Sequence, residues 1–185
     1  ARWLNNINTK YSYRVIFIPE TVGCLAFLKK NLKNLKNKLL FGYTITCIGD
    51  GGNFSFLPDK NSSSLVNRFT LNFFKKNKIR IKKYSWLDRG SDERQYCAPN
   101  IELPIASIMR SKYNTFNEYH TSLDKYGDVV KEKYLKDSVL ILKKLIMNNK
   151  KIQIPYTKIK GEPFMTKYKL YPTLSNKKQK KKTEK

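Results

Sequence analysis

Acidic side chains and the single histidine of this chain follow predicted strands, where side chains from distant segments can meet. Glu20 comes just after the apolar run 13–18, and Asp50 follows the run 42–48. His120 is the only histidine among the 185 residues. Zinc takes carboxylates and imidazoles as ligands in hydrolytic sites, and such sites also need a free carboxylate to deprotonate the metal-bound water. The residue types are therefore those that a metal-assisted hydrolytic site would use.

Two further segments concentrate charged residues. The loop 87–94, after a predicted strand, contains Asp92, Glu93 and Arg94 among its charges. The segment 118–124 begins with Glu118 and ends with Asp124. Sites in layered α/β proteins form in the loops that leave the carboxyl ends of strands, so we expect these segments to lie near Glu20 and Asp50.

Each of these residues also has a purely structural interpretation. An acid just after a strand is often a helix N-cap or lies in the first turn of a helix, which fits Glu20, Asp92 and Glu93. Asp50 stands among three glycines, where turn chemistry alone explains an aspartate. A single histidine outside a tight motif such as His-Glu-x-x-His is more often filler than ligand. Spacing alone leaves both interpretations open.

The order of the predicted elements is that of a layered α/β sheet. Runs rich in β-branched and aromatic residues predict strands at 13–18, 42–48, 79–86 and 104–109. Apolar residues at helical spacing predict helices at 25–39, 65–73 and 134–146. Strands that alternate with helices indicate a sheet covered by helices. The periodicity fades after residue 150, and the lysine-rich segment 176–185 is predicted to be disordered.

Length and composition restrict the class of protein. A chain of 185 residues that is 40% hydrophobic and 13% aromatic fits one domain with a packed core. It contains no run of about eighteen apolar residues and no signal-peptide pattern, so we expect no membrane span. Its three cysteines, Cys24, Cys47 and Cys97, are widely spaced, which argues against disulfides and a thiolate zinc site. Together these features predict a cytoplasmic protein.

The charge is strongly positive. Lys and Arg number 38 against 14 Asp and Glu, a net charge of +24. One interpretation is an electrostatic surface for nucleic acid or another polyanion. The other is a lysine- and asparagine-rich composition with no specific role. The scarcity of arginine, which makes the bidentate contacts to phosphate and guanine, favours the second interpretation.

Several strings of residues occur in a characteristic order. The longest are Arg89-Gly-Ser-Asp-Glu-Arg-Gln-Tyr-Cys-Ala-Pro99, Leu103-Pro-Ile-Ala-Ser-Ile-Met-Arg-Ser-Lys-Tyr113 and Glu118-Tyr-His-Thr-Ser-Leu-Asp124. Phe17-Ile-Pro-Glu-Thr-Val-Gly23, Thr46-Cys-Ile-Gly-Asp50 and the segment 161–174 accompany them. With these strings the chain resembles a bacterial aminopeptidase-like family, often described only as a domain of unknown function. That family is related to zinc-dependent aminopeptidases with a co-catalytic metal site.

The resemblance implies a fold and a set of metal-site residues. The fold would be a three-layer α/β/α sandwich around a mixed, mainly parallel sheet, incomplete at its N-terminus. Glu20 would be general base or metal ligand, and we favour the base. Asp50 and His120 would bind zinc. Asp124 would orient the imidazole of His120.

The same resemblance assigns the neighbouring charges to the pocket. Asp92 and Glu93 match an element that lines the pocket, where they would contact substrate or support the structure. Arg94 follows them in the same string. Because these residues are not expected to bind metal, the chain supplies at most three metal-site groups, one imidazole and two carboxylates.

The chain also departs from the family pattern. In relatives, a histidine-rich turn and an Asn-Asp-Asn-like element with a bridging aspartate come earlier than the segment that matches Ala1. A winged-helix region follows the segment that matches 151–175. We therefore expect residues 1–150 to be the C-terminal part of a catalytic domain, 151–175 a connecting segment and 176–185 a tail.

Two functions remain open from the sequence. The first is a fragment of a zinc-dependent aminopeptidase-like hydrolase that acts on a peptide or small amide. The complete domain would hold one or two zinc ions, and this chain alone would bind zinc weakly or not at all and be inactive without its missing N-terminal part. The second is a non-catalytic basic remnant that binds nucleic acid or another polyanion.

Overall fold

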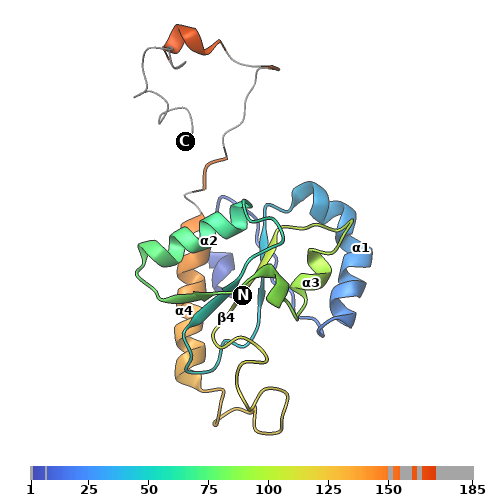
Figure 1. Ribbon diagram of the computed structural model, residues 1–185, viewed down its shortest axis with the longest axis vertical. Helices are drawn as coiled ribbons and strands as arrows, with labels where there is room; N and C mark the ends of the chain where they lie inside the picture. Colours follow the sequence, from blue (N-terminus) through green and yellow to red (C-terminus); the bar gives the residue numbers. More distant parts are fainter. Residues whose placement is uncertain (1, 7, 150–151, 155–159, 162–163, 170–185) are drawn as a thin grey trace. The chain divides into compact units, whose positions relative to one another are not determined.

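The computed structural model describes residues 2–6, 8–149, 152–154, 160–161 and 164–169 (Figure 1). The chain divides into two units, 1–151 and 152–185. The described part of the second unit contains a short 3-10 helix, η4 (Met165–Tyr168). The tail predicted at 176–185 lies outside the described residues. In the part of the chain that is described, no helix is both long and apolar enough to cross a membrane.

The first unit has three layers with a four-stranded sheet in the middle. Helices α2 (Leu65–Lys76) and α4 (Glu132–Asn148) cover one face. Helices α1 (Val22–Lys38) and α3 (Glu93–Tyr96) cover the other, as Figure 1 shows. The short 3-10 helices η1 (Arg2–Asn6) and η2 (Trp86–Asp88) complete the unit.

The sheet is mixed. Its strands are β1 (Gly42–Ile45), β2 (Phe54–Leu57), β3 (Ile81–Lys83) and β4 (Ile105–Met109), in the spatial order β1-β4-β2-β3. β1 is parallel to β4 and β2 is parallel to β3, whereas β2 and β4 are antiparallel. The carboxyl ends of β1 and β4 therefore meet at one edge of the sheet.

Alternate residues of the central strands form the two cores. Phe56 of β2 and Ile108 of β4 face α2 and α4, where they pack with Phe73 and Leu145. On the opposite face, Ile105 packs with residues of α1. Because side chains alternate across a strand, one short strand contributes to both layers.

Two helices match their predicted apolar spacing closely. The segment predicted at 65–73 is α2, which Ser64 caps by accepting a hydrogen bond from the Asn67 amide. The segment predicted at 134–146 is α4. The segment predicted at 25–39 is α1, although Leu25 is exposed.

The strand predicted at 13–18 is wrong. Residues 13–18 form no strand, and the Phe17 side chain is 87% exposed. The run lacks the hydrogen-bonding partner that a strand requires, because no strand of the described residues pairs with it. Apolar β-branched residues favour a strand only where a neighbouring strand and a packed layer exist.

Two elements were not predicted. β2 is four residues long and begins soon after the glycines at 49–52, which suggested only a turn. α3 is a single turn at 93–96, too short to show helical spacing. The strands predicted at 42–48 and 79–86 are also shorter than expected, since only 42–45 and 81–83 pair with neighbours.

Candidate active site at the carboxyl ends of β1 and β4

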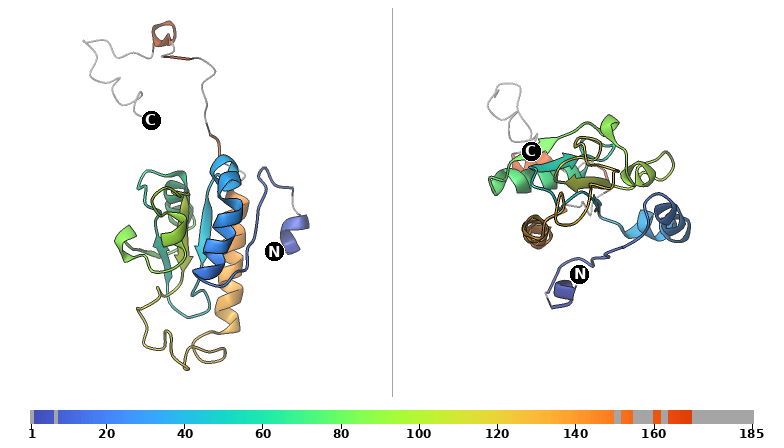
Figure 2. Two further views of the ribbon diagram at one scale, coloured as in Figure 1. Left: turned by 90° about the vertical axis from the view of Figure 1, so that its right-hand side faces the viewer. Right: turned by 90° about the horizontal axis from the view of Figure 1, so that it is seen from below.

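The start of α1 and the long loop between β4 and α4 lie at the same end of the first unit (Figure 2). This is the edge at which β1 and β4 end, because α1 runs back along the sheet before β1 begins. The segments that carry Glu20, Asp50 and His120 all meet this edge. Sites in α/β proteins form at such positions.

Glu20 lies in a tight turn immediately before α1. The Val22 amide donates a hydrogen bond to the Glu20 carbonyl at 2.6 Å, and Thr21 has a φ of 57°. A β-branched residue rarely adopts a positive φ, and such a conformation costs about 1–3 kcal/mol. Surrounding contacts must therefore hold the turn from which the exposed Glu20 side chain projects.

The loop before α3 supplies those contacts. The Thr21 amide donates to Asp92 Oδ1 at 2.7 Å, and the Ser91 hydroxyl donates to Glu20 Oε1 at 2.7 Å. Burial raises the pKa of Asp92, and the hydrogen bond from Thr21 only partly opposes the rise. Arg94 is exposed and also lowers the pKa of Asp92. Asp92 is thus a support for the turn, not a free acid.

Glu93 is fully buried, with 0% exposure, beneath this loop. Its Oε1 accepts hydrogen bonds from the Gly90 and Ser91 amides at 2.9 and 3.0 Å and from the Tyr113 hydroxyl at 2.9 Å. Its Oε2 accepts from the Ser107 hydroxyl at 2.9 Å. Burial alone would raise the pKa of Glu93, but the hydrogen bonds outweigh it and lower the pKa. Glu93 is therefore an ionised anchor between the loop and β4.

Asp50 is buried after β1 and is tied to the chain that leaves β4. Its Oδ1 accepts from the Gly52 amide at 2.6 Å and from the Ser111 hydroxyl at 2.8 Å, and its Oδ2 accepts from the Ser111 amide at 3.2 Å. The bond to Gly52 is the turn chemistry that the glycines suggested. A Cβ at position 52 would lie 2.7 Å from Asp50 Oδ1, so only glycine fits there.

His120 is exposed in the loop between β4 and α4. It has a φ of 59°, and its ring stacks on Tyr119 with 4.2 Å between the ring centroids. Asp124 is also exposed, and no hydrogen bond joins its carboxylate to the imidazole among the contacts that the structure describes. The orienting role expected for Asp124 therefore stays a prediction.

Cys47 follows β1 and is half-buried. Burial raises the pKa of this thiol, and the negative charges of Asp124, Asp50 and Glu20 raise it further. Cys47 packs against the core cluster of Leu57, Met109 and Tyr113. Cys47 also has a positive φ of 46°, so strained backbone occurs at three segments of this site.

Tyr119 links the histidine loop to the same group. Burial raises the pKa of its hydroxyl, followed by the charges of Cys47, Glu20 and Asp124. Tyr119 stacks on His120 and packs against the same core cluster as Cys47. The fold therefore brings the histidine loop and the end of β1 to the same edge.

The donors are of a kind that zinc accepts, but they do not form a zinc site. Within the described ranges, no three His, Cys, Asp or Glu side chains are arranged so that they could hold one metal ion. Both carboxylate oxygens of Asp50 are already occupied by hydrogen bonds. The expected convergence of Glu20, Asp50 and His120 on one ion is not formed by these residues alone.

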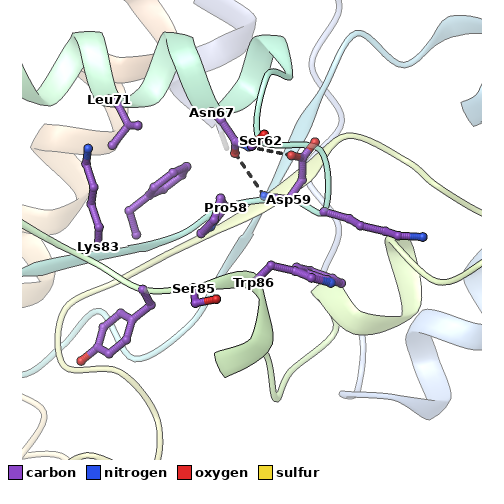
Figure 3. A pocket seen from close by; sticks show the side chains of 11 residues that line it. Pro58, Asp59, Ser62, Asn67, Leu71, Lys83, Ser85 and Trp86 are labelled. Carbon is purple, nitrogen blue, oxygen red and sulfur yellow. Dashed lines mark hydrogen bonds between the residues drawn. The ribbon is translucent and has the colours of Figure 1, made fainter.

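Two cavities are present among the described residues, and one of them adjoins the site. One, of about 310 Å³, lies beside Asp50 and is lined also by Glu118, Asp128 and Tyr134. The other, of about 360 Å³, lies where β2 and β3 end, between Pro58, Lys83 and Trp86 (Figure 3). In its wall the buried Asp59 accepts hydrogen bonds from Ser64 and Asn67 at 2.9 and 2.7 Å.

Sequence reasoning missed the residues that hold the site together. Ser91 and Ser111 donate to the two central carboxylates, and Tyr113 donates to the anchor. All three stand in the strings that carry the family resemblance, next to charged residues. Their place in these strings, beside charged residues, was the signal that could have identified them. Serines and tyrosines are too common in proteins for such a signal to establish their roles.

The layered α/β fold also occurs in a solved structure. A crystal structure of a "putative peptidase" from Clostridium acetobutylicum matches the structure with a TM-score of 0.74 and 32% identity, over 80% of this chain and 35% of that chain. The predicted α/β class with a mixed sheet is confirmed.

Sequence comparisons show the family to which the chain belongs. A "Putative polysaccharide biosynthesis protein with aminopeptidase-like domain" from Clostridium acetobutylicum is 37% identical over 124 residues, which is 67% of this chain and 28% of the relative. The family model "Domain of unknown function (DUF4910)" matches residues 1–151. The chain belongs to this family, and the resemblance to an aminopeptidase-like domain of unknown function is confirmed. The chain spans about a third of the proteins that it matches.

Proposed function

We propose that this chain forms part of the catalytic domain of a zinc-dependent aminopeptidase-like hydrolase that cleaves a peptide or a small amide. The meeting of the turn that carries Glu20, the loop that carries Asp50 and the loop between β4 and α4 at one end of the sheet carries this proposal. Serines hold both carboxylates there, since Ser91 donates to Glu20 and Ser111 donates to Asp50. The peptidase-like names of the relatives support the same class of reaction.

Each residue has a role in the proposed reaction. Glu20 accepts the proton of the attacking water and delivers it to the leaving amine. Its exposed carboxylate suits this work, since only Oε1 is held by Ser91 in the described contacts. Asp50 and His120 would hold the metal, and Asp124 would orient the imidazole.

The metal has a limited place in this chain alone. Zinc, when bound, lowers the pKa of water and polarises the carbonyl of the substrate. Asp50 and His120 are two of the three or four ligands that such an ion needs, so the chain binds zinc weakly. We propose that the remaining ligands come from a further part of the family's domain, and that the chain alone is inactive. The complete domain would hold one or two ions.

We place this reaction in the cytoplasm. The three cysteines are free, and Cys24 and Cys97 are buried, as is usual for a protein of a reducing compartment.

A chimaera tests the proposal. This chain replaces the matching segment of the Clostridium acetobutylicum relative, and hydrolysis of aminoacyl amides is measured together with zinc content. The chimaera should hydrolyse the amide, whereas the chain alone should not. Glu20→Gln should abolish turnover and leave the zinc content unchanged, because Glu20 moves a proton and does not hold the ion.

Glu102→Gln is the matched control, since Glu102 is exposed and its ion pair among the described residues is with the exposed Lys60. It should leave turnover unchanged. Full activity of the Glu20→Gln chimaera would remove Glu20 from the role of base. A chimaera that folds and binds zinc but hydrolyses no amide would remove the hydrolase proposal.

The charge of +24 favours a second candidate, the binding of a polyanion such as nucleic acid. Binding of this kind weakens steeply as salt rises, in proportion to the phosphates that are neutralised. The affinity of the chain for a DNA duplex, measured from low to physiological salt, decides the matter. Absence of binding at physiological salt would dispose of this candidate.

A further inference from the structure

We infer that Ser91 is a positioning residue for Glu20, whose carboxylate its hydroxyl holds toward the site while the buried Glu93 carboxylate keeps Ser91 in place. This inference rests on the proposed role of Glu20 as general base. It concerns one hydrogen bond, from Ser91 Oγ to Glu20 Oε1 at 2.7 Å.

The first step is that Glu20 needs a partner to be ordered. Its side chain is exposed and has several rotatable bonds, so an unheld carboxylate would sample many orientations. The hydroxyl of Ser91 is its one hydrogen-bond donor among the described residues. A hydrogen bond to a charged acceptor is stronger than one between neutral groups. This bond therefore selects one orientation of the carboxylate.

The second step is that Ser91 itself is fixed. Its side chain is only 7% exposed, and its amide donates to Glu93 Oε1 at 3.0 Å. Glu93 is in turn held by the hydroxyls of Tyr113 and Ser107. The position of the Ser91 hydroxyl is thus set from the centre of the sheet, because Ser107 belongs to β4.

The third step separates the hydroxyl from the backbone. Asp92 holds the neighbouring Thr21 amide, so the turn before α1 has its own support. The bond between Ser91 and Glu93 uses the Ser91 amide and not its side chain. Ser91→Ala therefore removes the hydrogen bond to Glu20 while it leaves the loop and the turn in place.

The fourth step concerns the chemistry. The Ser91 hydroxyl donates to Oε1, which leaves Oε2 free to accept a proton from water. Ser91 neither gains nor loses a proton in the reaction.

The test is carboxyl ¹³C NMR of the full chain at neutral pH, with labelled glutamate and with the Glu20 signal assigned through Glu20→Gln. In Ser91→Ala, the Glu20 carboxyl signal should move toward that of a freely solvated glutamate, since Oε1 loses the hydrogen bond from Ser91. Ser91→Thr, which keeps a hydroxyl, should restore the wild-type signal. Ser85→Ala is the matched control, because Ser85 caps η2 and makes no contact with Glu20.

The readout does not depend on turnover. A Glu20 carboxyl signal that is unchanged in Ser91→Ala, or that moves equally in Ser85→Ala, would overturn the inference. The expected shift in a chain whose chimaera hydrolyses no amide would support the positioning by Ser91 and count only against the proposed function. Urea midpoints of the variants confirm that each one is folded.

Discussion

The buried Glu93 offers a sharp test of how the site is anchored. Its carboxylate accepts four hydrogen bonds, from the Gly90 and Ser91 amides and from the hydroxyls of Tyr113 and Ser107. Glu93→Gln keeps a carbonyl oxygen that can accept the three hydrogen bonds now made to Oε1. Its amide NH2 group takes the place of Oε2, so the Ser107 hydroxyl would accept a hydrogen bond in place of donating one. Hydrogen bonds to charged groups contribute about 1.5–3 kcal/mol each, against about 1 kcal/mol for neutral ones.

The loss of charge assistance is partly offset because the buried charge no longer has to be desolvated. We therefore expect Glu93→Gln to lower the free energy of unfolding by about 1–3 kcal/mol. Glu93→Ala leaves all four donors unpaired and should cost about 3–5 kcal/mol. Glu102→Gln, at a side chain that is 63% exposed, is the control and should change stability by less than about 0.5 kcal/mol.

The difference between wild type and Glu93→Gln should depend on pH. The pKa of Glu93 is lowered in the folded chain from an ordinary value of 4.5. A lowered pKa means that the carboxylate stabilises the fold fully above the ordinary value. The contribution is lost as pH falls through the lowered folded pKa. The wild-type advantage should thus shrink in acid, since glutamine does not titrate.

Urea unfolding followed by tryptophan fluorescence measures these differences at several pH values. Equal stability of wild type and Glu93→Gln at neutral pH would refute the description of Glu93 as an anchor. A difference that grows as pH falls would refute the direction of its pKa.

Two further substitutions test the edge where β1 and β4 end. Gly52→Ala places a Cβ against the Asp50 carboxylate and should cost about 1–3 kcal/mol in urea unfolding; unchanged stability would show that the loop is free to move. Arg110→Lys removes bonds from a buried guanidinium to Ser138 Oγ and to the Gly52 carbonyl, both at 2.8 Å, and should lower the thermal midpoint by several degrees. An unchanged thermal midpoint would mean that lysine at position 110 replaces the hydrogen bonds of the guanidinium.

Helices were predictable from this sequence where the spacing of apolar residues matches a buried face of the helix. In α2, Val66, Thr70 and Phe73 recur at helical intervals and are buried, so the pattern and the packing agree. The strand predicted at 13–18 is wrong because β-branched and aromatic residues only favour an extended chain. A strand also needs a neighbouring strand with which to form hydrogen bonds. β2 was missed because four residues are too few to show a period.

The site was predictable in its residue types but not in its contacts. Asp50 follows β1 as predicted, whereas Glu20 follows no strand and reaches the same edge in the turn before α1. Their hydrogen-bond partners are serines 71 and 61 residues away in sequence, and no local pattern indicates such pairs. Only the fold, through the buried Glu93, shows why Ser91 stands beside Glu20.

The central claim is that Asp50 and His120 belong to one metal site. His120 is the only histidine, so its ring signals in ¹H–¹⁵N NMR of the full chain are unique. Added zinc should shift these signals, and Asp50→Asn should weaken the affinity at least about tenfold. Asp128 lines the cavity beside Asp50, and Asp128→Asn should leave the zinc affinity unchanged. Equal zinc affinity of wild type and Asp50→Asn, or no shift of His120, would contradict the claim.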